Sequence, residues 1–381
     1  MIINLFSYTK TLWDSKSVSK KRYKVIYSRD STPRWMFPVS SKDPLFLKTY
    51  SGVGFVNGLV KFIIESFFRL RIAHLVLGKF FLPGFSLNPE ILKIIDDYRI
   101  IDYGIFLGTI GKNRKIIFVL KSESGMIYFL KYYTSGESKK LIQKESEMLW
   151  SFQNNNLKVK VPNVVESSNS MILIESLGDT ITQINYDSKE INYFTIERPF
   201  KENLLVDTSL KSIFLEKKIV EITKSNKRLQ SLVLNYLLKN EDNIFLLSLA
   251  HGDFTPWNVF YTKNDKILIL DWELSSILPL FYDYFHFKIQ PLIMSAKISS
   301  DDILHKLDLS YLNKRVLELT EREIKVVDYL ILYLISIMNF YIPIYEKQEN
   351  LHWQAEKSIN IWKEILFKLL ENEDYYRKNY N

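Results

Sequence analysis

The segment HGDFTPWNVFYTKNDKILILD, residues 251–271, carries three polar side chains whose types and spacing suit one chemical task. Asp253 and Asn258 lie five residues apart, on a stretch where a glycine and a proline favour a turn. Asp271 follows the apolar run KILIL, so its carboxylate ends a buried strand and is costly there unless a cation meets it. Carboxylate and amide oxygens are the ligands that Mg²⁺ prefers and shares with phosphates. Asn258 and Asp271 are therefore candidate metal ligands, and Asp253 is left to accept a proton from a hydroxyl.

Phosphoryl transfer requires such a division of tasks, because one carboxylate positions the nucleophile while a metal ion neutralises the β- and γ-phosphates. It also requires a cation that grips the nucleotide. Lys131, in the run YFLKYY, is the candidate cation, and Glu145 is preferred to Glu147 as its partner on the next helix. The turn LGTIGKNRK offers Gly108 and Gly111, where backbone amides can approach phosphates closely, although this turn carries little weight alone.

The runs of apolar residues predict the elements that must position these side chains. β-rich runs divided by turns indicate an antiparallel lobe of five strands, with one helix after the third strand. The expected strands are 101–108, 115–121, 126–133, 161–167 and 171–176, and the expected helix is 137–153. From about residue 200 the pattern is mainly helical. The sequence therefore predicts an α+β fold with a small antiparallel β-rich lobe and a larger helical lobe.

Three regions follow from this division. They are an N-terminal extension without an assigned role at 1–95, a nucleotide-binding β-rich lobe at 96–178 and a helical catalytic lobe at 179–381. Within the extension, Asn88 and Pro89 predict the start of a short helix. Segment 54–82 is aromatic and basic, and its charged side chains exclude a membrane span. We interpret it first as core or lobe-packing surface and alternatively as a peripheral membrane contact.

The composition of the 381 residues limits the classes of protein to which the chain can belong. The absence of cysteine excludes disulfides and thiolate chemistry and fits a reducing compartment. No signal peptide is expected, since the start lacks a basic head followed by an apolar core. Residues 326–345 are nearly apolar but hold Asp328, and we interpret them as a buried helix. The net charge of +8 is spread along the chain without a nucleic-acid-binding motif, which favours small anionic partners or a membrane surface over nucleic acid.

The motifs HGDFTPWN and ILDWE together resemble the catalytic core of the aminoglycoside phosphotransferase and choline kinase-like family, which has the protein-kinase-like fold. The resemblance covers about residues 100–345 and leaves the first hundred residues unexplained. It implies that Asp253 is the catalytic base and that Asn258 and Asp271 bind Mg²⁺. It also implies that Asp283, in PLFYDYFHF, braces the catalytic loop from the following helix.

The same resemblance implies an ATP site in the small lobe. Its expected residues are Lys131 with Glu145, the turn glycines Gly108 and Gly111, and Glu175 and Leu177 of the run IESLG, which would receive the adenine ring through backbone groups. His251 is expected to be structural, whereas Glu273 is either a further acidic ligand or a solvated residue. Trp257 stands where the family often has glycine, and we expect it to pack the loop rather than to line the acceptor site.

These residues predict an ATP- and Mg²⁺-dependent kinase that phosphorylates a hydroxyl of a small molecule, a sugar or a cell-envelope glycan. The alternative is a pseudokinase, a binding module that kept the fold and lost turnover. A metal-dependent hydrolase is disfavoured, because no further His/Asp cluster completes a two-metal site. The bias to Ile, Lys, Asn and Phe suggests an AT-rich bacterial genome. We expect a cytoplasmic protein, or one peripheral at the inner membrane face, whose N-terminal extension docks the acceptor or a membrane-bound partner.

Overall fold

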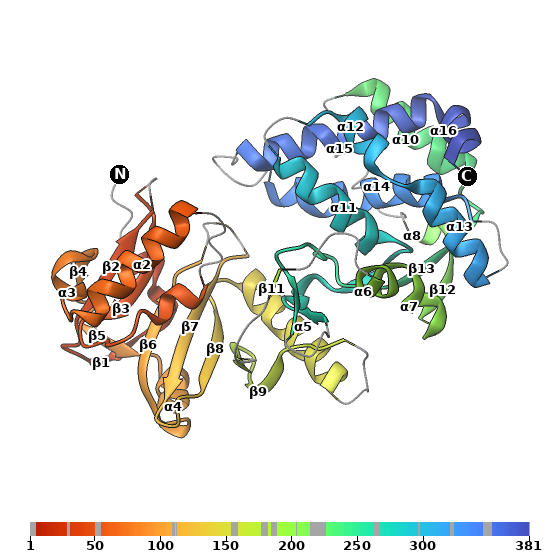
Figure 1. Ribbon diagram of the computed structural model, residues 1–381. Coiled ribbons are helices and arrows are strands. Elements are labelled where there is room, and N and C mark those ends of the chain that lie inside the picture. The colour runs from red at the N-terminus through yellow and green to blue at the C-terminus, as the bar shows by residue number, and fades with distance from the viewer. Residues whose placement is uncertain are drawn as a thin grey trace. The chain divides into compact units, whose positions relative to one another are not determined.

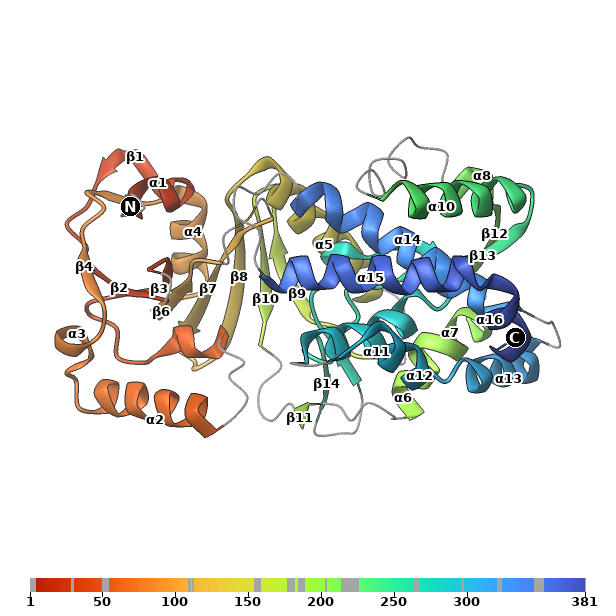
Figure 2. The same cartoon turned by 90° about the horizontal axis from the view of Figure 1, so that it is seen from above.

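The computed structural model divides the chain into two compact units, Met1–Asp179 and Thr180–Asn381 (Figures 1 and 2). It describes residues 5–28, 31–49, 55–108, 111, 113–153, 159–176, 182–183, 189–202, 204–213, 226–262, 267–295, 298–320, 324–345 and 353–380. The first unit is built on antiparallel sheet and the second is mainly helical. This confirms the predicted α+β class.

An eight-stranded antiparallel sheet forms the centre of the first unit, in the order β4-β2-β3-β6-β7-β8-β10-β9. Its strands are β2 (Tyr23–Tyr27), β3 (Pro33–Pro38), β4 (Lys79–Phe81), β6 (Ile100–Phe106), β7 (Lys115–Ser122), β8 (Ile127–Tyr133), β9 (Asn163–Ser167) and β10 (Met171–Glu175). Helix α5 (Gly136–Gln153) packs against β8, β9 and β10. The five strands and one helix predicted for residues 96–178 are all present, each within a few residues of its expected bounds.

Residues 1–95 are not a separate extension, because three of their strands continue this sheet. The junction is the pair β3 and β6, in which Trp35 lies opposite Phe106 and Met36 opposite Ile105. Leu12 shares one buried core with residues of β6, β7 and β8. Removing residues 1–95 would therefore open the core of the first unit. The boundary expected near residue 95 has no counterpart in the compact units.

The remaining elements of the first unit cover the sheet. They are α1 (Leu5–Tyr8), η1 (Lys10–Leu12), β1 (Trp13–Val18) paired with β5 (Phe85–Leu87), η2 (Leu45–Thr49), α2 (Phe55–Arg69), α3 (Ala73–Val76) and α4 (Pro89–Asp97). Helix α4 begins as predicted, since the Asn88 side chain accepts a hydrogen bond from Glu90 N at 3.0 Å and Pro89 occupies the first turn.

The second unit contains two three-stranded antiparallel sheets, and most of its other elements are helices. One sheet is β11 (Thr182–Gln183), β14 (Val259–Tyr261) and β15 (Ile267–Ile269), and the other is β12 (Leu205–Ser209), β13 (Ile244–Ala250) and β16 (Ser276–Pro279). The helices are α6 (Lys189–Asn192), η3 (Tyr193–Glu197), α7 (Arg198–Lys201), α8 (Leu210–Ile213), α10 (Lys227–Lys239), η4 (Trp272–Leu274), α11 (Tyr282–Met294), α12 (Ser300–Lys306), α13 (Leu309–Thr320), α14 (Val326–Tyr345), α15 (Trp353–Glu371) and α16 (Glu373–Tyr380).

Helix α14 is long and apolar enough to cross a membrane by length and composition, but 67% of its most apolar window is buried inside the protein. Most of its apolar side chains belong to the main core of the second unit. Its acidic residue, Asp328, is buried and accepts hydrogen bonds from Arg377 at 2.6 Å and from the Tyr236 hydroxyl at 3.2 Å. The helix is thus a core element whose one charge is paired, as the sequence indicated.

Candidate active site

The loop between β13 and β14 is held by the carboxylate of Asp283, at the start of α11. Its two oxygens accept hydrogen bonds from His251 N at 2.7 Å and from Gly252 N at 3.1 Å. Burial raises the pKa of Asp283, while the histidine and these two backbone bonds act in the opposite direction. The bracing role expected for Asp283 therefore has a direct geometric basis.

Gly252 cannot be replaced without strain. Its φ is +84°, and a Cβ on it would stand 2.4 Å from the carbonyl oxygen of Leu274. Only glycine adopts this backbone conformation freely, and only glycine lets the two chain segments approach so closely. The glycine thus sets the turn that presents the next residue, Asp253.

His251 has a structural role, as expected. The Nε2 atom lies 2.8 Å from the carbonyl oxygen of Leu270, and Asp253 N donates to Nδ1 at 3.2 Å. A carbonyl oxygen only accepts, so Nε2 carries the proton and Nδ1 is the acceptor. The ring therefore fastens the loop to the strand that ends at Leu270, with both nitrogens engaged.

Asp253 and Asn258 are in direct contact. The amide Nδ2 of Asn258 donates to Asp253 Oδ2 at 2.9 Å and to the Asp253 carbonyl oxygen at 3.0 Å. Because the amide nitrogen is used in this way, the oxygen Oδ1 of Asn258 is the atom that can serve a cation. The side chain of Asp253 is 26% exposed, so its carboxylate faces solvent in part.

A buried histidine on α11, which the sequence analysis missed, contacts the other oxygen of Asp253. His286 Nε2 lies 3.1 Å from Asp253 Oδ1, and since a carboxylate accepts, Nε2 donates. Behind it, the Tyr333 hydroxyl lies 3.4 Å from His286 Nδ1, and Gln290 Nε2 donates to that hydroxyl at 3.3 Å. Complete burial raises the pKa of Tyr333, so the phenol keeps the proton that it donates. The spacing in the sequence could have identified His286, because it follows Asp283 by three residues and therefore lies on the same face of the helix.

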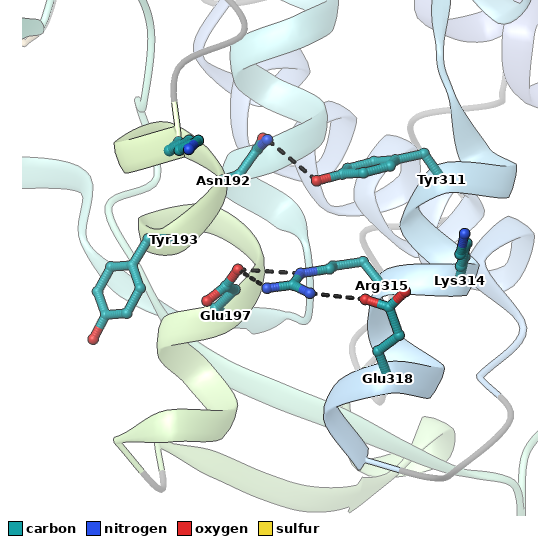
Figure 3. Close-up of a pocket in the computed structure, with 8 residues that line it drawn as sticks. Asn192, Tyr193, Glu197, Tyr311, Lys314, Arg315 and Glu318 are labelled. Atoms are coloured by element: carbon teal, nitrogen blue, oxygen red, sulfur yellow. Dashed lines mark hydrogen bonds and ion pairs between the residues drawn. The ribbon is translucent and has the colours of Figure 1, made fainter.

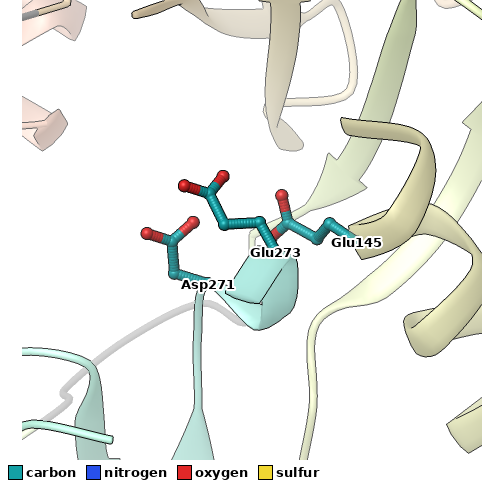
Figure 4. Close-up of side chains that lie close together, drawn as sticks. All are labelled: Glu145, Asp271 and Glu273. Carbon is teal, nitrogen blue, oxygen red and sulfur yellow. The ribbon is translucent and has the colours of Figure 1, made fainter. Parts of the chain in front are cut away.

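Asp271 lies at the end of β15, as predicted, and its backbone is left-handed with φ 66° and ψ 57°. Non-glycine residues seldom adopt this conformation, and such strain is concentrated at functional sites. Leu270 N donates to the Asn258 carbonyl oxygen at 2.8 Å, which aligns the two segments that carry the candidate metal ligands. A carboxylate oxygen of Glu273, on the same turn, lies within 4.8 Å of one of Asp271 (Figure 4). This oxygen-rich set suits a hard divalent cation such as Mg²⁺.

Aromatic packing supports the loop from within the second unit. Phe254 stacks on Phe194 with ring centroids 4.8 Å apart. The rings of Trp272 and His251 contact each other edge-on, with centroids 4.7 Å apart. Both Phe254 and Trp272 are fully buried. Trp257 is instead 43% exposed, so the packing role expected for it is taken by these two residues.

The first unit brings together the predicted lysine and glutamate. Lys131 Nζ, on β8, lies 2.7 and 2.8 Å from the two carboxylate oxygens of Glu145 on α5. The Glu145 side chain is fully buried and that of Lys131 is 13% exposed. An ion pair this deep fixes the ammonium group in one position.

The glycine turn between β6 and β7 is held by the N-terminus of the chain. Gly108 has φ +77°, and its carbonyl oxygen accepts a hydrogen bond from the Tyr8 hydroxyl at 3.3 Å. Arg114 donates to the Tyr8 carbonyl oxygen at 2.6 Å and stacks its guanidinium on the Tyr8 ring at 3.7 Å. Gly111 also has a positive φ, 158°, so both glycines of the turn have backbone conformations that other residues seldom adopt. No local pattern pointed to Tyr8, because its contacts span about a hundred residues.

The expected hinge is described only in part. Glu175 ends β10, and its side chain accepts a hydrogen bond from Asn163 Nδ2 at 3.0 Å. Ser176 N donates to the Ile127 carbonyl oxygen at 2.8 Å. Leu177 lies outside the described residues.

A cavity of about 500 Å³ in the second unit is separate from these residues (Figure 3). Its lining includes Glu197, Tyr311, Arg315 and Glu318. Arg315 bridges the two glutamates, and Lys201 also pairs with Glu197 at 2.5 Å. Burial raises the pKa of Glu197, but its bonds to Lys201 and Arg315 outweigh burial and leave the pKa lowered. These ion pairs tie η3 to α13 and give the cavity a structural explanation.

Residues 197–289 match the phosphotransferase enzyme family. We refer to residues 197–289 as the phosphotransferase-family segment, after the family that they match. The segment contains the braced loop, the β14–β15 hairpin and Asp283, so it confirms the resemblance seen in HGDFTPWN and ILDWE. No curated protein matches the chain by sequence.

Several solved structures are similar in backbone to this chain. Choline kinase LicA from Streptococcus pneumoniae is 15% identical, covers 74% of this chain and 98% of its own, and has a TM-score of 0.48. The gentamicin complex of APH(2")-IIa is 16% identical, covers 74% of this chain and 99% of its own, and has a TM-score of 0.44. A microcompartment-associated aminopropanol kinase is 12% identical, covers 76% of this chain and 98% of its own, and has a TM-score of 0.45.

Proposed function

We propose that this chain is a kinase that transfers the γ-phosphoryl group of ATP to a hydroxyl of a small molecule, a sugar or a cell-envelope glycan. The observation that carries the proposal is the loop in which Asp283 fixes the backbone and Asn258 and His286 fix the carboxylate of Asp253. That loop lies within the phosphotransferase-family segment.

Asp253 acts as the general base. Each of its carboxylate oxygens already accepts one hydrogen bond, and an oxygen has a second lone pair to accept the hydroxyl proton of the acceptor. As that proton moves to Asp253, the acceptor oxygen bonds to the γ-phosphorus and the bond from phosphorus to the β-phosphate oxygen breaks, which releases ADP. The two bonds to Asp253 hold the base in position before the acceptor arrives.

Mg²⁺ fits the donor set of Asn258 Oδ1 and the Asp271 carboxylate, with Glu273 as a further oxygen donor nearby. When bound, a divalent cation neutralises charge on the β- and γ-phosphates. The left-handed backbone of Asp271 orients its carboxylate at the end of β15, where the preceding strand is buried. These residues account for the carboxylate that the sequence places after an apolar strand.

Lys131 grips the nucleotide phosphates, and Glu145 keeps the ammonium group in place. Gly108 and Gly111, in the turn that Tyr8 and Arg114 support, bring backbone amides near the phosphates. The run that contains Glu175 and Leu177 receives the adenine ring through backbone groups. Backbone groups at such a hinge would recognise the adenine ring through its shape and its hydrogen-bonding edge.

We place the protein in the cytoplasm, where ATP and reduced conditions prevail, or at the inner face of the membrane. Trp257 is exposed one residue before Asn258, and we assign its ring to acceptor binding. An exposed aromatic ring suits the face of a sugar or an alkylammonium group. Mutation of Trp257 therefore changes acceptor preference rather than nucleotide binding.

A thermal-shift screen of ATP and GTP with and without Mg²⁺, followed by ADP release with a panel of hydroxyl acceptors, tests this function. Binding to the folded state raises the melting temperature, by an amount that grows with ligand concentration. The proposal predicts a metal-dependent shift and ADP release with at least one acceptor. Metal-dependent nucleotide binding without transfer to any acceptor would support the pseudokinase instead, and no binding at all would remove both.

A further inference from the structure

The first unit exposes an unusual number of large apolar side chains between residues 59 and 82. They are Leu59, Val60, Phe62, Ile63, Leu70, Leu75, Val76, Phe80 and Leu82, and together they define the α2 surface. Phe62 is 59% exposed and Leu75 is 69% exposed. Helices α2 and α3 and strand β4 lie at the same end of the first unit in both views (Figures 1 and 2). Scattered apolar residues are ordinary on a protein surface, but such a concentration marks an interaction site.

Helix α2 is apolar on two faces, and only one face is buried. Phe68 lies in a small core with Phe37 and Phe46. Leu59, Phe62 and Ile63 follow the i, i+3, i+4 spacing of a separate helix face, and all three are exposed. Ser66 also falls on that face, and its hydroxyl donates to the Phe62 carbonyl oxygen at 2.8 Å. The Ser66 hydroxyl on the exposed face therefore already has a hydrogen-bond partner, so this face can enter an apolar environment without leaving the hydroxyl unpaired.

Basic side chains border this surface. Lys61, Arg69, Arg71 and Lys79 are exposed, whereas Glu65 is the acidic residue of the segment. Among the described parts of the chain, no carboxylate lies within ion-pair distance of these four cations. The segment thus combines an apolar stripe with net positive charge, the combination by which peripheral helices bind anionic lipid.

A cavity adjoins the C-terminal end of α2 and has a volume of about 620 Å³. Its charged lining residues are the cations Lys42, Arg69 and Arg71 and the carboxylates Asp43 and Glu65. The loop that brings Lys42 there is pinned, since the backbone N atoms of residues 42 and 43 donate to Asp102 Oδ2 at 2.8 and 3.1 Å. Asp43 is paired with Lys121, so Lys42, Arg69 and Arg71 leave the cavity with an excess of positive charge for a phosphate headgroup.

We propose that the α2 surface docks the protein on a membrane that contains anionic phospholipid. Phe62 and its apolar neighbours enter the headgroup and acyl boundary, while Arg69 and Arg71 meet lipid phosphates. A second copy of the chain is a poorer occupant, because a symmetric contact would set two cationic borders against each other. The inference goes beyond the proposed kinase activity and does not depend on it.

Vesicle co-sedimentation tests the proposal with the full chain and with vesicles of phosphatidylcholine alone or mixed with phosphatidylglycerol. The wild type is expected to bind the mixed vesicles and to lose that binding between 0.1 and 1 M salt, since the Debye length falls from about 10 to about 3 Å. Lys61→Gln with Arg69→Gln should weaken binding about fivefold for each charge removed. Phe62→Ser should weaken it at least about tenfold.

Matched controls separate the surface from general effects. Ile101→Ser removes an apolar side chain of similar exposure, 60%, from β6 of the same unit. Lys16→Gln removes an exposed charge from β1. Both controls should bind like the wild type. The proposal fails if the wild type does not bind mixed vesicles, if the controls weaken binding as much as the test variants, or if light scattering shows a dimer that Phe62→Ser dissociates. Activity on a soluble acceptor, measured without vesicles, reports separately on the kinase proposal.

Discussion

Breaking the pair between Lys131 and Glu145 should destabilise the first unit strongly and in an asymmetric way. Both carboxylate oxygens of Glu145 accept from the lysine, and the glutamate side chain is fully buried. Lys131→Met removes the cation and leaves a buried carboxylate, which costs about 3–5 kcal/mol. Glu145→Gln leaves an ammonium group that retains 13% exposure to water, so its cost should be smaller, about 1–3 kcal/mol.

The double variant should recover most of the loss, because no buried charge remains in it. We therefore expect a coupling energy of at least about 2 kcal/mol from a double-mutant cycle. Urea unfolding followed by circular dichroism measures the four proteins of the cycle. The same variants report on function, since each single change should also weaken Mg²⁺-dependent ATP binding.

The same unit offers a matched control in the pair Lys121 and Asp43. These side chains meet at 2.5 Å but are 34% and 40% exposed. An exposed pair is screened by water, so its coupling energy should be about 0.2–1 kcal/mol. Equal coupling in the two cycles, or a value below about 1 kcal/mol for Lys131 and Glu145, would refute the reasoning from burial.

Three further predictions concern the second unit. His286→Leu removes the bond that orients Asp253 and should lower kcat about tenfold or more with little change in nucleotide KM, whereas unchanged kcat would leave the histidine a packing residue. Gly252→Ala should lower both turnover and thermal stability, because its Cβ would meet the Leu274 carbonyl oxygen at 2.4 Å; a variant as stable as the wild type would contradict this. Glu197→Gln should reduce the free energy of unfolding at neutral pH. Since the folded pKa of Glu197 is lowered, that difference should shrink as pH falls below its ordinary value of 4.5, and a difference independent of pH would count against the ion pairs.

Local sequence patterns predicted those strands and helices in which apolar residues recur at a regular spacing along the whole element. The strands and helix between residues 96 and 178 belong to this class, as does the start of α4 at Asn88 and Pro89. The proximity of Asp253 and Asn258 was also predictable, because both lie on one short loop. Burial of α14 could be inferred because one acidic residue interrupts an otherwise apolar helix.

Local sequence patterns could not predict which strands pair when they lie far apart in the chain. Strand β3 begins and ends with proline, Pro33 and Pro38, which obscured it, yet it joins the sheet through β6 some seventy residues later. The support of the glycine turn by Tyr8 and the seating of His286 behind Asp253 likewise depend on contacts between distant segments. Only tertiary structure assigns these residues, and it shows residues 1–95 to be part of the same compact unit as residues 96–179.

Turnover of Asp253→Asn tests the central claim most directly, since the change keeps the size of the side chain and removes the base. Phosphoryl transfer should fall about 10²–10⁴-fold, while Mg²⁺-dependent ATP binding and the melting temperature stay close to those of the wild type. Transfer at the wild-type rate in a correctly folded Asp253→Asn protein would contradict the account.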